Sequence, residues 1–244
     1  MNKILFAVLF PFLCLAENVD FSFSQDNNQW VGDFCDYPID QELFYELEWG
    51  WVNVPEMNTK GMFLSGNNHS DDLFMFIKRP IMGLKPNTLY DLTFTVDIVA
   101  DVPVGHDVGV GGSPGQSVYF KVGAASIEPQ KIRMNNFYYL NVDKGDQSQG
   151  GKNAIVVGTL GRTGSTNRFY SKQFKNMTPL SMKTDGEGKL WLFLGTDSGY
   201  EGTTMFFVTK ISVQAEAHVD VSPAFKKGSK AVTNDSLSEV PLAE

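Results

Sequence analysis

The sequence has few of the residues that form covalent cross-links or nucleophilic active sites. Its 244 residues include two cysteines and three histidines. Removal of an N-terminal leader containing Cys14 would leave Cys35 alone, and no internal disulfide could then form. A catalytic thiol needs a histidine partner, and none of His69, His106 and His218 stands in a recognisable motif. We therefore expect Cys35 to be a small buried side chain.

Basic side chains are scarce relative to acidic ones. Twenty Lys and Arg against 28 Asp and Glu give a formal net charge of −8 at pH 7. Lys and Arg carry most of the non-specific affinity for nucleic acid, so we expect no nucleic-acid partner and no anionic membrane surface. Neutral ligands and cations fit this charge balance better.

The chain lacks an apolar run long enough to cross a bilayer, but its N-terminus resembles an export signal. Met1–Lys3 is basic, residues 4–13 are apolar, and Cys14-Leu15-Ala16 is a suitable cleavage site. The apolar run has about ten residues, whereas a spanning helix needs roughly twenty. We expect residues 1–16 to be a signal peptide and the mature chain to be secreted or periplasmic. A lipid on Cys14 and a soluble N-terminus that merely resembles a signal are the alternatives.

Short alternating runs bounded by Gly, Pro, Asn and Asp fill most of the remaining sequence. In Leu89–Ala100 apolar side chains occupy every second position, which is typical of a half-buried β-strand. Runs of the same kind predict strands at 73–78, 117–123, 153–158, 189–195 and 203–213. From about residue 216 the composition is polar and we expect a loosely ordered tail, 216–244. Residues 17–215 then form one β-sandwich domain.

Three of these segments carry more detailed predictions. Leu190–Leu194 is apolar on both faces, which indicates a central strand covered on two sides. Asp40–Leu47 fits either a helix capped by Asp40 or a strand that continues to Trp51, and its aromatic content favours the strand. In the run at 203–213 we expect alternate residues to share one face: Met205, Phe207, Thr209, Ile211 and Val213.

Several short strands separated by turn signals predict an all-β fold, an antiparallel β-sandwich. The opening Phe21–Trp30 segment, the Leu84–Tyr90 turn into a core strand and the closing Phe206–Val213 strand are similar in order to galactose-binding-like jelly rolls. That architecture includes many carbohydrate-binding modules. The resemblance implies a jelly-roll sandwich and a carbohydrate ligand, and it identifies no binding residue.

Three polar, glycine-rich segments are the candidate binding loops: 109–117, 143–151 and 195–202. Loops of a β-scaffold commonly carry the binding groups. The candidate ligand-binding residues are Asp143, Asp146, Gln147, Asp197, Ser198, Tyr200 and Glu201. Structural calcium is an open alternative, since carboxylates and amides suit it, although the second segment lacks the EF-hand spacing. Another alternative is that Asp197 and Ser198 only hold a tight turn.

Aromatic side chains are the other candidates, because sugar rings stack on them. They are Trp30, Trp49, Trp51, Trp191, Tyr119, Tyr138, Tyr139 and Tyr200. Glycosylation sequons begin at Asn68, Asn176 and Asn234, and they matter only in a host that glycosylates.

Catalytic motifs are absent from the sequence. The 109–117 segment has no Gly-Lys-Ser/Thr ending and precedes a strand, which excludes a phosphate loop. Gly111-Gly112-Ser113-Pro114-Gly115 matches the letters Gly-x-Ser-x-Gly, but a strand and not a helix follows it, so it is not a nucleophile elbow. No His-Glu-x-x-His and no Cys/His cluster occurs. We expect an exported, non-enzymatic domain that binds a polar ligand, with carbohydrate as the expected class. The alternatives are a structural or protein-interaction module and a glycan hydrolase that uses paired carboxylates.

Overall fold

The computed structural model describes residues 17–102, 109–162 and 168–218. Within these ranges the regular elements are fifteen β-strands in sheets of seven, five and three strands. No helix in the described part of the chain is long and apolar enough to span a membrane. The expected signal peptide and the expected tail beyond residue 218 lie outside the described residues.

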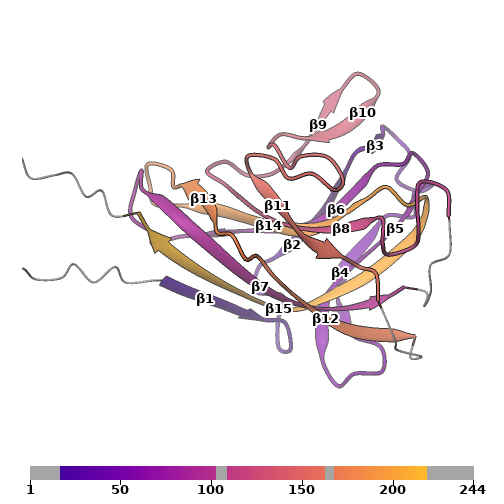
Figure 1. Cartoon of the computed structure of the whole chain (residues 1–244), viewed down its shortest axis with the longest axis horizontal. Helices are drawn as coiled ribbons and strands as arrows, with labels where there is room; N and C mark the ends of the chain where they lie inside the picture. The colour runs from indigo at the N-terminus through magenta and orange to yellow at the C-terminus, as the bar shows by residue number, and fades with distance from the viewer. Residues whose placement is uncertain (1–16, 103–108, 163–167, 219–244) are drawn as a thin grey trace, which may run out of the picture.

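The largest sheet forms one face of the molecule (Figure 1). Its strands are β1 (Glu17–Ser22), β4 (Glu48–Asn53), β5 (Lys60–Asn68), β7 (Leu89–Asp101), β12 (Phe169–Lys175), β13 (Leu180–Lys183) and β15 (Gly202–Ala217). They follow the order β12-β7-β15-β5-β4, with β1 beside β15 and β13 beside β7. Each pairing in this sheet is antiparallel.

The second sheet has the order β11-β8-β14-β6-β2 and is also antiparallel. Its strands are β2 (Val31–Cys35), β6 (Leu73–Ile81), β8 (Val118–Ala125), β11 (Ala154–Thr159) and β14 (Leu190–Ser198). A small sheet, β3-β10-β9, projects above it in Figure 1 and contains β3 (Tyr37–Pro38), β9 (Lys131–Met134) and β10 (Phe137–Leu140). The predicted all-β antiparallel sandwich is confirmed.

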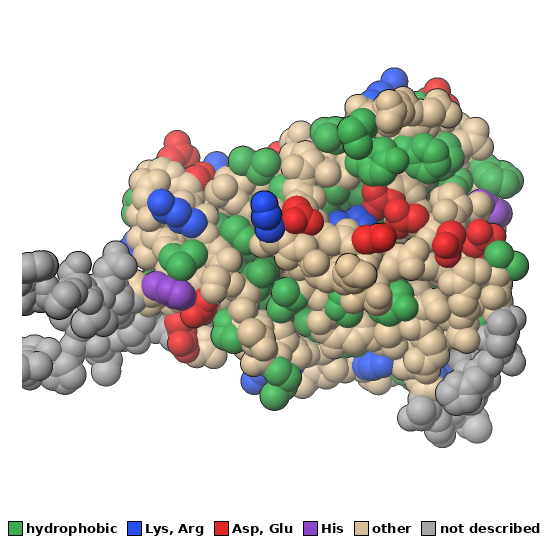
Figure 2. Space-filling view, turned by 45° about the horizontal axis from the view of Figure 1, so that its top comes forward, with side chains coloured by type: hydrophobic (Ala, Val, Ile, Leu, Met, Phe, Trp, Pro, Cys, Tyr) green, Lys and Arg blue, Asp and Glu red, His purple; other side chains and the backbone are tan. Residues whose placement is uncertain are grey.

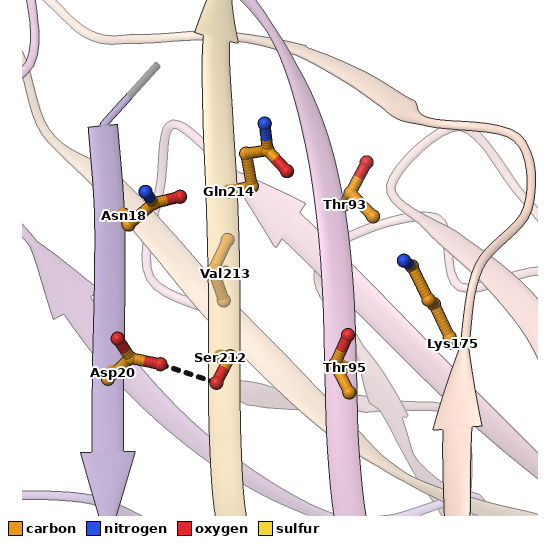
Figure 3. Close-up of a pocket in the computed structure, with 8 residues that line it drawn as sticks. All are labelled: Asn18, Asp20, Thr93, Thr95, Lys175, Ser212, Val213 and Gln214. Carbon is orange, nitrogen blue, oxygen red and sulfur yellow. Dashed lines mark hydrogen bonds between the residues drawn. The ribbon is translucent and has the colours of Figure 1, made fainter.

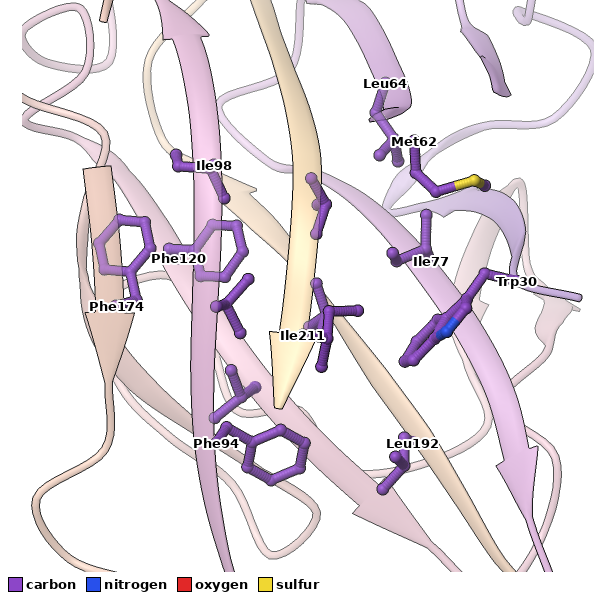
Figure 4. Close-up of a cluster of buried hydrophobic side chains, with 14 of the residues drawn as sticks. Trp30, Met62, Leu64, Ile77, Phe94, Ile98, Phe120, Phe174, Leu192 and Ile211 are labelled. Carbon is purple, nitrogen blue, oxygen red and sulfur yellow. The ribbon is translucent and has the colours of Figure 1, made fainter. Parts of the chain in front are cut away.

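Alternating side chains of the two larger sheets form the main core (Figure 4). In β7 the predicted period of two is confirmed: Phe94 and Val96 are fully buried and face the core, while Thr93 and Thr95 face outward, half-buried. Core contacts include the stacked rings of Phe120 and Phe174, with centroids 4.5 Å apart. Burial of such apolar area is the main favourable contribution to folding, so this alternation fixes which face of each sheet turns inward.

A β-bulge overturns the prediction that 203–213 presents one continuous apolar face. The register of β15 on β7 shifts between Val208 and Lys210. Before the shift Phe206 and Val208 face the main core, and after it Ile211 does. The extra residue changes the phase of the alternation. Phe207 consequently packs in a separate apolar cluster on the outward face.

The segment before β4 is neither the preferred strand nor the alternative helix. Asp40 and Glu46 have φ values of 62° and 51°, and the Tyr45 N–H donates to the Gln41 carbonyl (2.9 Å). These left-handed residues end any regular run on both sides. The segment forms turns that place Tyr45 in the core, with 2% of its surface exposed, and the strand begins at Glu48.

The five-stranded sheet is covered on both faces, as the apolar Leu190–Leu194 run predicted. Leu192 faces the main core, whereas Phe193 packs in a second core with Phe74, Phe76 and the free, buried Cys35. Val142 and Leu140 belong to the same second core. The 126–153 part of the chain therefore lies over the outward face of this sheet, and the candidate site forms where that cover meets the strand ends.

Candidate functional site

The three polar segments meet at one end of the five-stranded sheet. The Gly199 N–H donates to the Ser117 carbonyl (2.9 Å), and the Glu201 N–H donates to the Val110 carbonyl (2.9 Å). These bonds join the first and third segments. Gln147 joins the second, because its N–H donates to Asp197 Oδ2 (3.0 Å) in the third segment. Segments that are far apart in the sequence thus form one surface.

Asp197 lies in β14, because this strand extends to Ser198 and does not end at the expected residue 195. Its side chain points to the covered face and is 0% exposed. Asp197 Oδ2 accepts hydrogen bonds from Lys121 Nζ (2.7 Å), Lys144 Nζ (2.8 Å) and the Gln147 N–H (3.0 Å). The carboxylate therefore anchors the second polar segment to the sheet and does not reach solvent.

Lys121 is the buried cation that pairs with Asp197 beneath the loop. It is 0% exposed, and its ammonium also donates to the carbonyls of Lys144 (3.0 Å) and Gln149 (2.9 Å). A lysine has three donors, so those of Lys121 are all used. A buried charge is tolerated only when it is paired in this way.

Lys144 connects the cluster to the residue that follows β2. Its ammonium lies 2.9 Å from Asp36 Oδ2 and also donates to the Gly145 carbonyl (3.3 Å). With its bond to Asp197, all three donors are again used. Burial opposes the charge on Lys144, but the carboxylates of Asp197 and Asp36 outweigh it and raise the lysine pKa.

Three carboxyl groups gather around Lys144. Each of Asp36, Asp72 and Asp197 has an oxygen within 4.8 Å of an oxygen of the other two. Carboxylates so placed can ligate a metal ion. The Lys144 ammonium, however, already bonds to two of them at distances typical of a charge-assisted hydrogen bond. This cluster thus contains a cation of its own.

A shared proton accounts for two buried carboxyl oxygens of this cluster. Asp72 Oδ1 and Asp197 Oδ1 are buried, and among the described residues no group other than a carboxyl proton is placed to donate a hydrogen bond to them. Burial, the nearby Asp36 carboxylate and a hydrogen bond to Asp197 raise the pKa of Asp72 to about 8. Two adjacent carboxyl groups cannot both ionise easily, and the raised pKa of Asp72 favours a protonated Asp72 that donates a hydrogen bond to Asp197. Burial likewise raises the pKa of Asp36, against the effect of Lys144.

Above this cluster is a pocket of about 250 Å³. Figure 2 shows acidic side chains gathered around a hollow with basic atoms at its bottom and hydrophobic side chains above it. The pocket is lined by Asp36, Asp72, Tyr139, Leu140, Val142, Asp143, Lys144, Gly145 and Asp146. Carboxylates, one aromatic ring and two aliphatic side chains therefore face the same space.

Asp143 and Asp146 stand at the exposed rim of the pocket. Asp143 accepts hydrogen bonds from the N–H groups of Gly145 (3.0 Å) and Lys152 (3.0 Å), which lower its pKa. It holds the loop in shape. No residue in the described ranges donates a hydrogen bond to the carboxylate of Asp146, so it remains available to a ligand.

The other predicted residues take different positions. Ser198 is buried, and its hydroxyl donates to the Tyr200 carbonyl (3.0 Å), which is the structural role given above as an alternative. The Tyr200 ring is half-buried and packs against Gly109 and Gly202. Glu201 is half-buried and does not line the pocket.

The asparagines of two of the three sequons are buried and hydrogen bonded to the backbone. The Asn68 side-chain amide donates to the carbonyls of Ser198 (2.9 Å) and Tyr200 (3.0 Å), and Asn68 is 1% exposed. Asn176 is 5% exposed and donates to the Leu92 carbonyl (3.0 Å). Neither amide is free to carry a glycan in the folded chain. Asn234 lies outside the described residues.

A second depression lies on the outward face of the seven-stranded sheet (Figure 3). Its volume is about 200 Å³, and it is lined by Asn18, Asp20, Thr93, Thr95, Lys175, Ser212, Val213 and Gln214. These side chains project from β1, β15, β7 and the end of β12, and the Ser212 hydroxyl hydrogen bonds to Asp20. Hydroxyls and amides predominate here, whereas carboxylates predominate in the first pocket.

Sequence reasoning missed four members of the acidic cluster: Asp36, Asp72, Lys121 and Lys144. One signal for Lys121 was present, because it interrupts an apolar run on a strand whose neighbours are covered on both faces. The positions of Asp36 and Asp72, beside strand ends, give no such sign. Tyr139 was a candidate for sugar stacking, and it does line the pocket.

No protein-family model and no curated protein matches the chain. Solved structures similar to it include a putative sugar-binding protein of Bacteroides thetaiotaomicron, with 10% identity, TM-score 0.40, and 81% of this chain and 92% of that one covered. Another is the CBM22-1 xylan-binding domain of Paenibacillus barcinonensis Xyn10C, with 9% identity, TM-score 0.37, and coverage of 82% and 95%. A third is TmCBM27, a mannan-recognising carbohydrate-binding module, with 10% identity, TM-score 0.35, and coverage of 82% and 98%.

These neighbours are of the kind that the sequence resembles, carbohydrate-binding modules with a β-sandwich fold. The sandwich itself is established by the strand pairing described above.

Proposed function

We propose that this chain is an exported, non-enzymatic binding domain that takes a sugar unit of a glycan into the acidic pocket. The observation that carries the proposal is the pocket itself. Hydrogen-bond acceptors and an aromatic ring line one recess, and the buried ion cluster holds the loop that forms its rim. Its 250 Å³ is below the roughly 300–1,000 Å³ of sites for drug-sized ligands. A ligand of about one sugar ring suits that size.

The chemistry of the lining supports a polyhydroxylated ligand. Sugar hydroxyls are donors, and the carboxylates of Asp36 and Asp146 are acceptors that lie in the wall of the pocket. Tyr139 offers an aromatic surface to the apolar face of a sugar ring. The buried ion cluster beneath holds the loop in place before the ligand arrives, and this preorganisation lowers the entropy cost of binding.

The position of Asp197 argues against the particular hydrolase that the sequence allowed. A general acid or base must come within hydrogen-bond distance of the substrate. Asp197 is 0% exposed and bonded to two lysines, and Glu201 lies outside the pocket. A hydrolytic pair made of these two residues therefore has no support.

A glycan array probed with the labelled full-length chain tests the proposal. Wild type should bind a defined set of glycans, and Tyr139→Ala and Asp146→Asn should each lose most of that binding. Glu187→Gln is the matched control, because Glu187 is exposed in the turn before β14, at the opposite end of that strand from Asp197. Absence of binding by wild type, or equal binding by all four proteins, would contradict the proposal.

A further inference from the structure

The acidic pocket is lined by one ammonium group, that of Lys144, which has no free donor. Lys144 is the one basic residue that lines it, against the four carboxyl groups of Asp36, Asp72, Asp143 and Asp146. Its three donors are used by Asp36, Asp197 and Gly145. An anionic group of a ligand would therefore meet carboxylates and no unpaired cation.

Unused acceptors, in contrast, face the pocket. Asp36 is 4% exposed and lines it. Lys144 and Cys35 both bond to Asp36 Oδ2, and no described residue donates to Asp36 Oδ1. The Asp146 carboxylate at the rim also lacks a donor in the described part of the chain. These oxygens can accept hydrogen bonds from a donor that enters the pocket.

We infer that the pocket selects a glycan unit that carries a protonated amine, such as a 2-amino-2-deoxy sugar, over its N-acetylated and carboxylated counterparts. This inference rests on the proposed function and names its ligand class. An ammonium supplies three donors and a positive charge, which the free oxygens of Asp36 and Asp146 complement. The Tyr139 ring adds an aromatic wall, and aromatic faces attract cations.

The acidic pocket and the depression on the seven-stranded sheet differ in charge. The depression in Figure 3 contains Lys175 and one carboxylate, Asp20, which is already hydrogen bonded to Ser212. Selection by charge is therefore expected of the acidic pocket and not of the depression.

The test is calorimetric titration of the full-length chain, at mildly acidic pH and low salt, with three soluble oligomers of equal length: glucosamine, N-acetylglucosamine and galacturonate. We expect the glucosamine oligomer to bind at least about tenfold more tightly than the acetylated one, as one added charge-assisted hydrogen bond provides. Added salt should reduce this ratio, and galacturonate should not bind.

Asp146→Asn should bring the ratio close to one, and the Glu187→Gln control should leave it unchanged. Asp146 is exposed and its carboxylate accepts no hydrogen bond from a described residue, so this variant should fold. Equal affinity for the amino and acetylated oligomers, or a preference for galacturonate, would overturn the inference and leave the proposed function standing. Absence of binding to every glycan of the array would overturn both.

Discussion

Lys144 Nζ lies 2.8 Å from Asp197 Oδ2, and both side chains are buried. This ion pair fastens the 141–153 loop to the central strand of the five-stranded sheet. Lys121 and Asp36 complete the charge balance on either side of it. The pocket exists because of this attachment, since its rim residues belong to the loop and its floor belongs to the cluster.

Loss of the central carboxylate should destabilise the fold. Asp197→Ala leaves the Lys121 and Lys144 ammoniums without their shared acceptor, and breaking a buried pair from one side costs about 3–5 kcal/mol. Urea denaturation measures the loss. Asp146→Ala, which removes an exposed carboxylate from the same loop, should change the free energy of unfolding by no more than about 0.5 kcal/mol. Similar effects of the two substitutions would be inconsistent with a structural role for Asp197.

Removal of the Lys144 ammonium should allow the acidic cluster to bind a metal cation. In Lys144→Met, three carboxyl groups have oxygens within 4.8 Å of one another, and Lys121 is the one ammonium of the cluster that remains to pair with them. Calcium should then raise the melting temperature of the variant, by an amount that grows with calcium concentration. Lys152→Met, the same substitution at an exposed lysine of this loop, and wild type should respond weakly. An equal response of all three proteins would show that Lys144 does not take the place of a metal.

The stability contributed by Asp72 should depend on pH. Its pKa is about 8 in the folded chain against an ordinary 3.8. A carboxyl with a raised folded pKa contributes stability below pH 3.8, and that contribution declines as pH rises to about 8. Asp72→Asn cannot ionise, so the difference in unfolding free energy, wild type minus variant, should fall across this window. Denaturation at several pH values measures it. A flat or rising difference would contradict the protonated carboxyl.

The loop geometry should be sensitive to a single methyl group. Gly145 has φ of 73°, and a Cβ there would run into the carbonyls of Gln149 and Gly150. Gly83 has φ of 91° but nothing within 4 Å of such a Cβ. Both alanine substitutions carry backbone strain, and Gly145→Ala adds a steric clash worth about 1–3 kcal/mol. Chemical denaturation should show that difference, and equal losses would indicate an adaptable loop.

The alternation of apolar residues predicted much of the fold, because each sheet has a buried inner face. The prediction for β7 was correct along most of its length. The same pattern gave wrong predictions in two other segments. At Thr209 a bulge shifts the phase of β15, and in Asp40–Leu47 two left-handed residues make turns. Both features depend on single backbone conformations that hydrophobic patterning does not encode.

The candidate site was less predictable for a different reason. Polar loops identify where a binding surface can lie, and Asp143 and Asp146 do line the pocket. Whether a polar residue faces solvent or a buried partner depends on contacts between distant segments. Asp197 looked like a loop carboxylate, but its partners Lys121 and Lys144 lie 76 and 53 positions away.

Amide chemical-shift mapping tests most directly whether the ligand binds in the acidic pocket. The full-length, ¹⁵N-labelled chain is titrated with the glucosamine oligomer or, if another glycan binds best on the array, with that one. We predict that the largest shifts fall on residues 139–147 and on Asp36 and Asp72. Shifts confined to Thr93, Thr95, Ser212 and Gln214, on the outward face of the seven-stranded sheet, would contradict the account.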